Sequence, residues 1–166
     1  MAELTSKEHL QPSLLDRLTD LNPDRKTDTI EERVMSLRRL KESVIRDLEW
    51  LLNTGSLDTS HDLDDFPQVQ RSVLNYGIQD IAGGSASGRN TTNMERDLKQ
   101  SIIDFEPRIL PGSLRVGVKI DDTEMSAQTL IFEIQGELWW QPLPERFYLK
   151  TTLDLETGRF RKDSKE

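Results

Sequence analysis

Apolar residues between Ile30 and Leu52 repeat at helical spacing. At ~100° per residue they fall within an arc of about 140°, which is wide enough to face a core. Overlapping capping boxes over residues 28–32 favour a helix start there. Gly55, just beyond the last apolar residue, is suited to a helix end. The pattern therefore predicts a long helix over residues 29–53.

Two shorter helical patterns follow along the chain. Pro67 can occupy a first helical position, and the apolar residues behind it form one edge of a short helix over residues 67–75. A capping box at Thr92 precedes apolar residues at helical spacing, which predict a helix over residues 93–105. Pro107 restricts the residue before it to extended geometry, so we expect this helix to end at its predicted boundary.

Beyond these helices, the period of the apolar positions changes from 3.6 to 2. Alternation of apolar and polar residues predicts strands over residues 113–121, 129–140 and 146–155. Thr157-Gly158 can form a turn into a short fourth strand near Phe160. Because helices come first and strands second, we predict an α+β fold, in which N-terminal helices pack on one face of a small antiparallel sheet of three to four strands.

The chain has room for one ordinary domain, which we predict over residues 28–160. Residues 1–27 carry too little apolar surface to order themselves and are predicted to form a flexible N-terminal arm. Within this arm, apolar residues behind Ser13 predict a short helix near residues 13–20. Such a helix is unstable by itself, so we expect it to dock on another surface. Residues 161–166 form a charged tail.

The net charge of −8 opposes binding to phosphate backbones and to anionic lipids, so neither nucleic acid nor membrane insertion is expected. The chain has no Cys, and its two His residues, His9 and His61, lack a second ligand at zinc-like spacing. The Gly/Ser-rich segment over residues 83–88 lacks the ending of a phosphate-binding loop. We therefore predict no catalytic residue, no metal and no cofactor, and a cytoplasmic location.

Four large side chains need an account beyond the apolar pattern. Lys41 lies in the apolar arc of the long helix, so it must extend to solvent or meet a carboxylate. Trp50 lies on the opposite, charged face, where either the following loop covers it or it anchors a partner. Trp139-Trp140 fits a buried sheet end, which we favour, or an exposed rim.

The most distinctive short stretch is Phe105-Glu106-Pro107-Arg108. Extended geometry around Pro107 sends Glu106 and Arg108 to the same side of the chain, at the corner between the last helix and the sheet. One interpretation is a structural brace, in which Arg108 binds carbonyl groups of the helix and Glu106 pairs with a basic residue such as Lys41. The other is contact with a partner protein.

Four segments in series resemble one family. They are PSLLDRL at residues 12–18, SVIRDLEWLLNT at residues 43–54, SVLNYG at residues 72–77 and FEPR at residues 105–108. Together they resemble TssE, the baseplate subunit of type VI secretion, which is related to the lysozyme-like wedge protein of contractile-tail phages. The resemblance extends over residues 12–160.

The resemblance implies a cytoplasmic, non-enzymatic assembly subunit that joins other baseplate wedge subunits and starts polymerisation of the contractile sheath. It implies a monomer when alone and several copies in a ring. In that family the Glu-Pro-Arg corner is associated with docking onto other wedge subunits, and the sheet with mimicry of a sheath subunit. The residues expected to bind partners are Glu106, Pro107, Arg108, Leu14, Leu15, Leu18 and Trp50.

A physical mechanism for that role is strand addition, because an uncovered edge strand offers unpaired backbone groups to another chain. Two other functions stay open at this point. A peptidoglycan-cleaving muramidase needs one carboxyl held protonated in an apolar pocket near an ionised one. A regulatory adaptor could use the same fold for a different partner.

Overall fold

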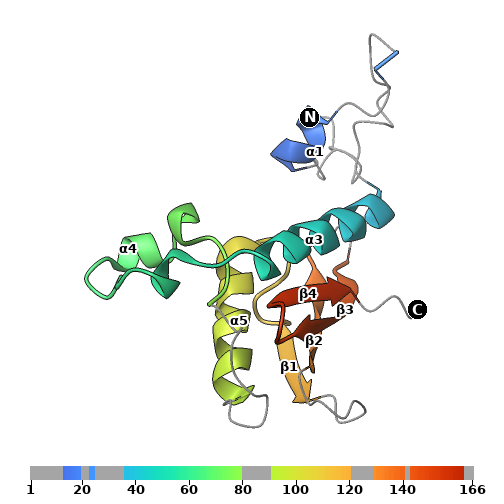
Figure 1. The fold of residues 1–166 in the computed structure, drawn as a ribbon. Helices are drawn as coiled ribbons and strands as arrows, with labels where there is room; N and C mark the ends of the chain where they lie inside the picture. Colours follow the sequence, from blue (N-terminus) through green and yellow to red (C-terminus); the bar gives the residue numbers. More distant parts are fainter. Residues whose placement is uncertain are drawn as a thin grey trace.

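A computed structural model describes the chain over residues 13–19, 23–24, 36–79, 91–120, 129–140 and 143–162. Two main helices and several short turns precede four strands (Figure 1). In chain order the elements are α1 (Leu14–Leu18), α3 (Leu37–Leu52), η2 (Leu57–Thr59), α4 (Pro67–Gln70), η3 (Val73–Asn75), α5 (Thr91–Phe105), β1 (Arg115–Ile120), β2 (Thr129–Leu138), β3 (Glu145–Asp154) and β4 (Arg159–Lys162). The predicted α+β fold is confirmed.

The strands form one antiparallel sheet in the order β1-β2-β3-β4. In its register, Phe132 of β2 lies opposite Val118 of β1 and Thr151 of β3. The turn before β4 contains Gly158 at a φ of 65°, a conformation that glycine adopts without strain. The short fourth strand predicted near Phe160 is therefore present, and it forms one edge of the sheet.

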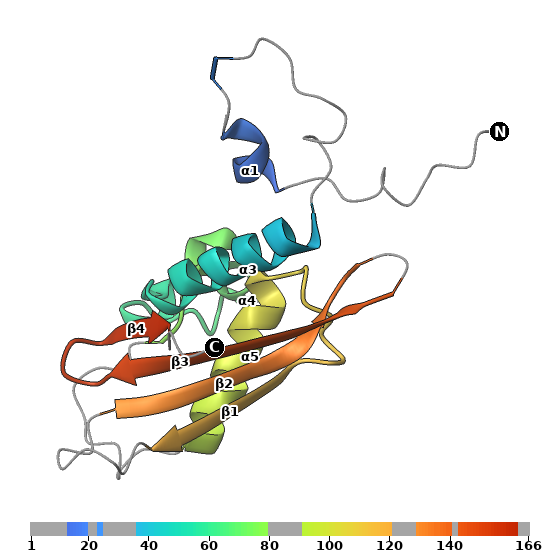
Figure 2. The same cartoon turned by 90° about the vertical axis from the view of Figure 1, so that its right-hand side faces the viewer.

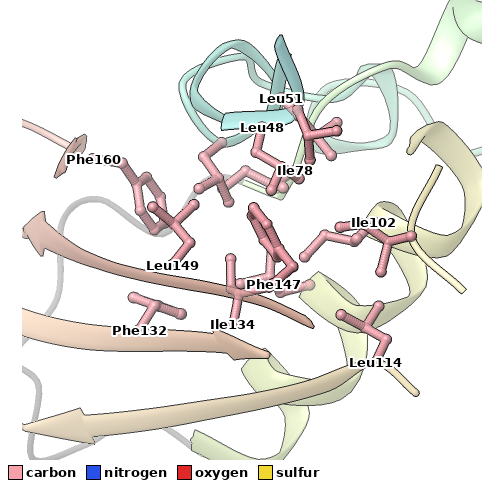
Figure 3. Close-up of a cluster of buried hydrophobic side chains, with 14 of the residues drawn as sticks. Leu48, Leu51, Ile78, Ile102, Leu114, Phe132, Ile134, Phe147, Leu149 and Phe160 are labelled. Carbon is pink, nitrogen blue, oxygen red and sulfur yellow. The ribbon is translucent and has the colours of Figure 1, made fainter. Parts of the chain in front are cut away.

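Helices α3 and α5 cover one face of the sheet, and the apolar core lies between the two layers (Figures 2 and 3). The ring centroids of Phe132 and Phe160 lie 5.1 Å apart and join β2 to β4. The largest fully buried side chains are Phe132, Leu48, Leu51, Ile102, Ile109, Leu114, Leu130, Ile134, Leu138, Leu153 and Val44. The buried apolar residues of α3 belong to the apolar arc read from the sequence, so that arc indicates which side of the helix faces the sheet.

The observed helix starts differ from the sequence pattern. Ser36 precedes α3, and its Oγ accepts the backbone N–H of Arg39 at 3.2 Å. The capping boxes predicted over residues 28–32 lie outside the described residues. At α5, the side chain of Glu95 was expected to complete a capping box, but it accepts the N–H of Val118 in β1 at 2.9 Å. This carboxylate therefore serves the sheet rather than the helix start.

The segment predicted as one helix over residues 67–75 consists of two short turns, α4 and η3. Ser72 separates them, because its Oγ accepts the N–H of Leu74 at 3.2 Å and donates to the C=O of Val69 at 2.9 Å. Such local bonds compete with a continuous helix. Gly77 follows with a φ of 135° and lies so close to the backbone after α3 that a Cβ would not fit.

The two outer edges of the sheet are capped by side chains at one residue each. At β1 the cap is the bond from Val118 to Glu95 described above. At β4 the N–H of Phe160 donates to Asn53 Oδ1 at 3.0 Å, and its C=O accepts from Asn53 Nδ2 at 3.4 Å. Since β1 and β4 each pair with one strand only, neither outer edge is paired with backbone of the described residues.

Candidate functional site

The predicted site residues Glu106, Pro107 and Arg108 form the corner between α5 and the sheet. The last turn of α5 holds Glu106, whose N–H donates to the C=O of Ile102 at 2.8 Å. The C=O of Arg108 accepts the N–H of Trp139 at 2.8 Å, just beyond β2. Helix and sheet therefore hold the corner from both sides.

Glu106 is buried, with 3% of its surface exposed, and its carboxylate binds Arg108. Glu106 Oε1 accepts from the backbone N–H and from Nε of Arg108 at 3.1 and 2.7 Å, and Oε2 accepts from Nη2. The two side chains bind each other, but Pro107 and Arg108 form a turn, closed by the N–H of Ile109 donating to the C=O of Glu106 at 3.2 Å, rather than the extended segment that was predicted. Because a buried charge without a partner is costly, the burial of Glu106 depends on this pair.

Arg108 also contacts α3. Its Nη1 donates to Ser43 Oγ at 3.1 Å, and its Nη2 donates to Asp47 Oδ2 at 2.5 Å. Burial alone would lower the pKa of the Arg108 guanidinium, but hydrogen bonds and charge from Glu106 and Asp47 outweigh burial and raise that pKa above its ordinary value. We call Ser43, Asp47, Glu106 and Arg108 the Arg108 brace, because they join the corner to α3.

Charge pairs continue from the Arg108 brace to α1. Arg46 Nη1 lies 2.6 Å from Asp16 Oδ1, and Arg46 Nη2 lies 2.8 Å from Asp47 Oδ1. Burial acts to raise the pKa of Asp16, but hydrogen bonds from Arg46 and Ser13 reverse this effect and leave that pKa below its ordinary value. The short helix α1 thus contacts α3 of its own chain through an ion pair.

An open groove of about 540 Å³ lies beside the Arg108 brace. Its apolar lining includes Leu15 of α1, Trp50 of α3, Tyr76, Phe105 and Pro107. The rings of Tyr76 and Phe105 pack edge to face, with centroids 5.3 Å apart. The groove therefore combines aromatic surface with the fixed backbone of the corner.

The structure brings most of the predicted partner-binding residues to this groove. Glu106 and Arg108 line it together with Leu15, Trp50 and Pro107. Leu14 and Leu18 are 71% and 74% exposed and are not part of its lining. The site residues expected from the sequence thus fall into two groups: five line the groove, and Leu14 and Leu18 are exposed on α1 outside it.

The loop after α3 does not cover Trp50, which was one of the two interpretations of this residue. Trp50 is 51% exposed, and the guanidinium carbon of Arg46 lies 5.2 Å from its ring centroid. Trp139 and Trp140 differ from each other, because Trp139 is 46% exposed whereas Trp140 packs against the core. The burial predicted for the pair therefore holds for Trp140 and is wrong for Trp139.

The suggested pairing of Lys41 with Glu106 is wrong. Lys41 Nζ lies 2.8 Å from Glu145 Oε1 at the start of β3, and Glu106 binds Arg108 instead. Lys41 does meet a carboxylate, as its place in the apolar arc requires. Lys41 lies in the first half of α3, and the carboxylate that it meets is at the start of β3 rather than at the corner.

Ser43 and Asp47 were not identified as site residues from the sequence. They lie four residues apart, a spacing that places both side chains on one side of a helix. That spacing is a signal for a shared binding partner, but it does not say which one. Asp47 and Arg108 are 61 positions apart in the chain, so only the packing of α3 on the sheet reveals their pairing.

The described residues contain no group of three or more His, Cys, Asp or Glu side chains that could hold a metal ion. No helix within the described ranges has the length and apolar character needed to cross a membrane. The buried carboxylate of Glu106 is bound by a guanidinium, whereas a glycosidase acid needs a protonated carboxyl in an apolar pocket. The arrangement is suited to presenting a surface in a fixed geometry.

A family model described as Baseplate wedge protein gp25 matches residues 38–143, which is more than half of the chain. The chain belongs to this family. The matched range begins in α3 and contains the whole Arg108 brace, whereas α1, β3 and β4 lie outside it. As a member of the baseplate wedge family, the chain has a structural role in a phage-tail-like baseplate.

Among solved structures, the chain is similar to a putative tail lysozyme from Geobacter sulfurreducens, at 18% sequence identity and a TM-score of 0.48. The alignment covers 80% of this chain and 100% of that chain. No curated protein matches the chain.

Replacement of the guanidinium tests the Arg108 brace. Arg108→Ala should lower the free energy of unfolding by about 3–5 kcal/mol, because Glu106 then stays buried without a counter-ion. Urea unfolding followed by circular dichroism measures the change. Removal of both charges in Glu106→Gln/Arg108→Met should cost less than Arg108→Ala alone. A loss below about 1 kcal/mol for Arg108→Ala would show an ion pair of the weak surface type instead.

Proposed function

We propose that this chain is a TssE-type baseplate subunit of a type VI secretion system, which connects wedge subunits and initiates sheath polymerisation by strand addition. The observation that supports strand addition most directly is the state of the sheet edges. Both β1 and β4 have a strand on one side only, and no backbone of the described residues pairs with their outer sides. A sheath strand could extend the sheet at such an edge.

The β1 edge is favoured for this addition. β1 has six residues, whereas β4 has four and has both backbone groups of Phe160 bound by Asn53. The N–H of Val118 faces the outer edge of β1, so by the alternation of a strand the backbone groups of Val116 and Ile120 face the same way. An added strand would have to displace Glu95 from Val118 and could pair with the neighbouring groups directly.

The free energy expected for adding one strand is too small for tight binding by a single subunit, but it is sufficient when several subunits act together. Roughly four to six added main-chain hydrogen bonds of about 0.5–1.5 kcal/mol each give a weak contact once the ordering cost is subtracted. Several copies held in a ring raise the effective concentration of neighbouring edges. A single copy in the cytoplasm, with a net charge of −8, would stay monomeric until the baseplate gathers it.

The groove beside the Arg108 brace is the proposed contact with other wedge subunits. Its exposed apolar side chains, Trp50 and Pro107, together with Leu14 and Leu18 on α1, are the kind of surface that protein interfaces bury. Glu106 and Arg108 act by holding the corner in place beneath that surface. This assignment makes the chain a non-enzymatic assembly part.

A proline in β1 tests strand addition. Val116→Pro removes one outward N–H and should reduce sheath assembly by at least about tenfold, since a missing donor interrupts the ladder. The measurement is the amount of polymerised sheath per baseplate in cells that carry the variant. Val116 also packs against the core, so Val116→Ala is the matched control, which loses packing but keeps the N–H. Normal sheath with a folded Val116→Pro chain would refute addition at β1.

Removal of one aromatic side chain tests the wedge contact. Trp50→Ala should weaken co-purification with baseplate wedge subunits by roughly tenfold or more, because an exposed Trp is a frequent centre of binding energy. The thermal unfolding transition should stay nearly unchanged. Phe66→Ala, which removes a similarly exposed ring away from the groove, is the control and should leave co-purification intact. Equal binding by Trp50→Ala and the unmodified chain would contradict the assignment of the groove.

A further inference from the structure

The outer face of the sheet carries a charge opposite to that of the whole chain. In Figure 2, α5 crosses behind the sheet, and no described helix covers the side that faces the viewer. Strand alternation and register place six basic and three acidic side chains on this face. These are Arg115, Lys119, Arg146, Lys150, Arg159, Arg161, Glu133, Glu137 and Asp154. The face thus has a net charge of +3 on a chain whose total is −8.

Two of the acidic side chains on this face are already occupied. Glu133 accepts hydrogen bonds from Lys119 Nζ at 2.9 and 3.0 Å. Asp154 binds the backbone N–H groups of Thr157 and Glu156, and these bonds are the main reason why the pKa of Asp154 lies below its ordinary value. Neither carboxylate is therefore available to neutralise the arginines at the other end of the face.

Arg115 and Arg146 are two basic side chains of this face for which the described residues supply no partner. Neither guanidinium forms a hydrogen bond or an ion pair with any part of the chain that the structure describes. Arg115 shares a row of the register with Gln135 and Tyr148, and Arg146 precedes Tyr148 in β3. Arg146 is therefore next to Tyr148 on this face of β3, and Arg115 lies across β2 from Tyr148, with Gln135 between them; Tyr148 is 54% exposed.

A shallow hollow of about 520 Å³ opens at this end of the sheet. Its lining includes both arginines, Tyr148, Gln135 and Glu137. Arginine and tyrosine are among the residue types that dominate binding energy at protein interfaces, and a guanidinium can bind a carboxylate through two parallel hydrogen bonds. The hollow therefore combines shape, an aromatic surface and two unpaired bidentate donors.

We propose that the outer face of the sheet is a second docking surface, which binds an acidic polypeptide segment through Arg115, Arg146 and Tyr148 of this hollow. This surface is separate from the groove beside the Arg108 brace and from the strand edges. The occupant is a polypeptide rather than a nucleic acid, because Glu133 and Glu137 interrupt the basic face and the remaining surface of the chain is strongly acidic. A second copy of the chain is disfavoured by the repulsion between two chains of charge −8.

The test uses the isolated full chain and a fluorescent oligoglutamate peptide as the probe, at low and at physiological ionic strength. The unmodified chain should bind the peptide, and Arg115→Glu/Arg146→Glu should reduce affinity by about tenfold or more. The matched control is Arg38→Glu/Arg96→Glu, which makes the same change in net charge at exposed positions on α3 and α5 and should alter affinity less than about twofold.

Several outcomes would overturn the proposal. Equal losses in the two double variants would mean that binding follows net charge alone. Failure of the unmodified chain to bind the peptide would remove the acidic segment as an occupant. Tighter binding of a single-stranded oligonucleotide of equal charge would assign the face to nucleic acid, and light scattering that shows self-association lost in Arg115→Glu/Arg146→Glu would assign it to a second copy. Because this assay contains no sheath or wedge subunit, its failure is distinguishable from failure of the proposed baseplate function.

Discussion

An open four-stranded sheet cannot pair the outer backbone groups of its two edge strands, and this constraint governs the surface of the molecule. The core is complete on the side of α3 and α5, but two strands end the hydrogen-bond ladder. The fold meets this problem with single side chains, Glu95 at β1 and Asn53 at β4. Each caps one residue and leaves its neighbours accessible, which keeps the edges usable for another chain.

The Arg108 brace determines how the accessible surfaces are placed relative to one another. Arg108 binds Ser43 and Asp47 on α3, and its own C=O binds the backbone beyond β2. These bonds join α3 and the corner that line the groove to the sheet, which carries the two edges and the outer face. An assembly subunit that holds several neighbours at defined positions depends on such cross-links between its elements more than on a reactive group.

Much of the architecture could be predicted from the sequence because apolar periodicity reflects burial directly. The change in period located the strands, and the arc on α3 located the buried side of that helix. Hydrogen bonds between side chains and backbone could not be read in this way, whether local or distant. Ser72 interrupts a segment that has a helical pattern, and Glu95 bonds to β1 although its local sequence suits a helix cap. In both cases a hydrogen bond of the side chain outweighs local propensity.

The candidate site was predictable in part for a similar reason. The sequence placed Glu106 and Arg108 on one side of Pro107, but it suggested Lys41 as the partner of Glu106, and only the structure shows that Glu106 binds Arg108. The contact with Asp47 depends on the packing of α3, which no local pattern specifies. The basic face of the sheet was visible as alternation in single strands, but the cross-strand register was needed to show that Arg115 lies across β2 from Tyr148.

Residue-resolved amide hydrogen exchange of β1, with and without sheath subunits, tests the central claim most directly. In the isolated chain, the amides of Val116 and Ile120 should exchange rapidly, whereas Glu95 should protect that of Val118. Addition of a sheath strand should protect all three together. Binding of sheath subunits that leaves Val116 and Ile120 as exposed as before would contradict the claim that this chain works by lending its unpaired strand edge to a neighbour.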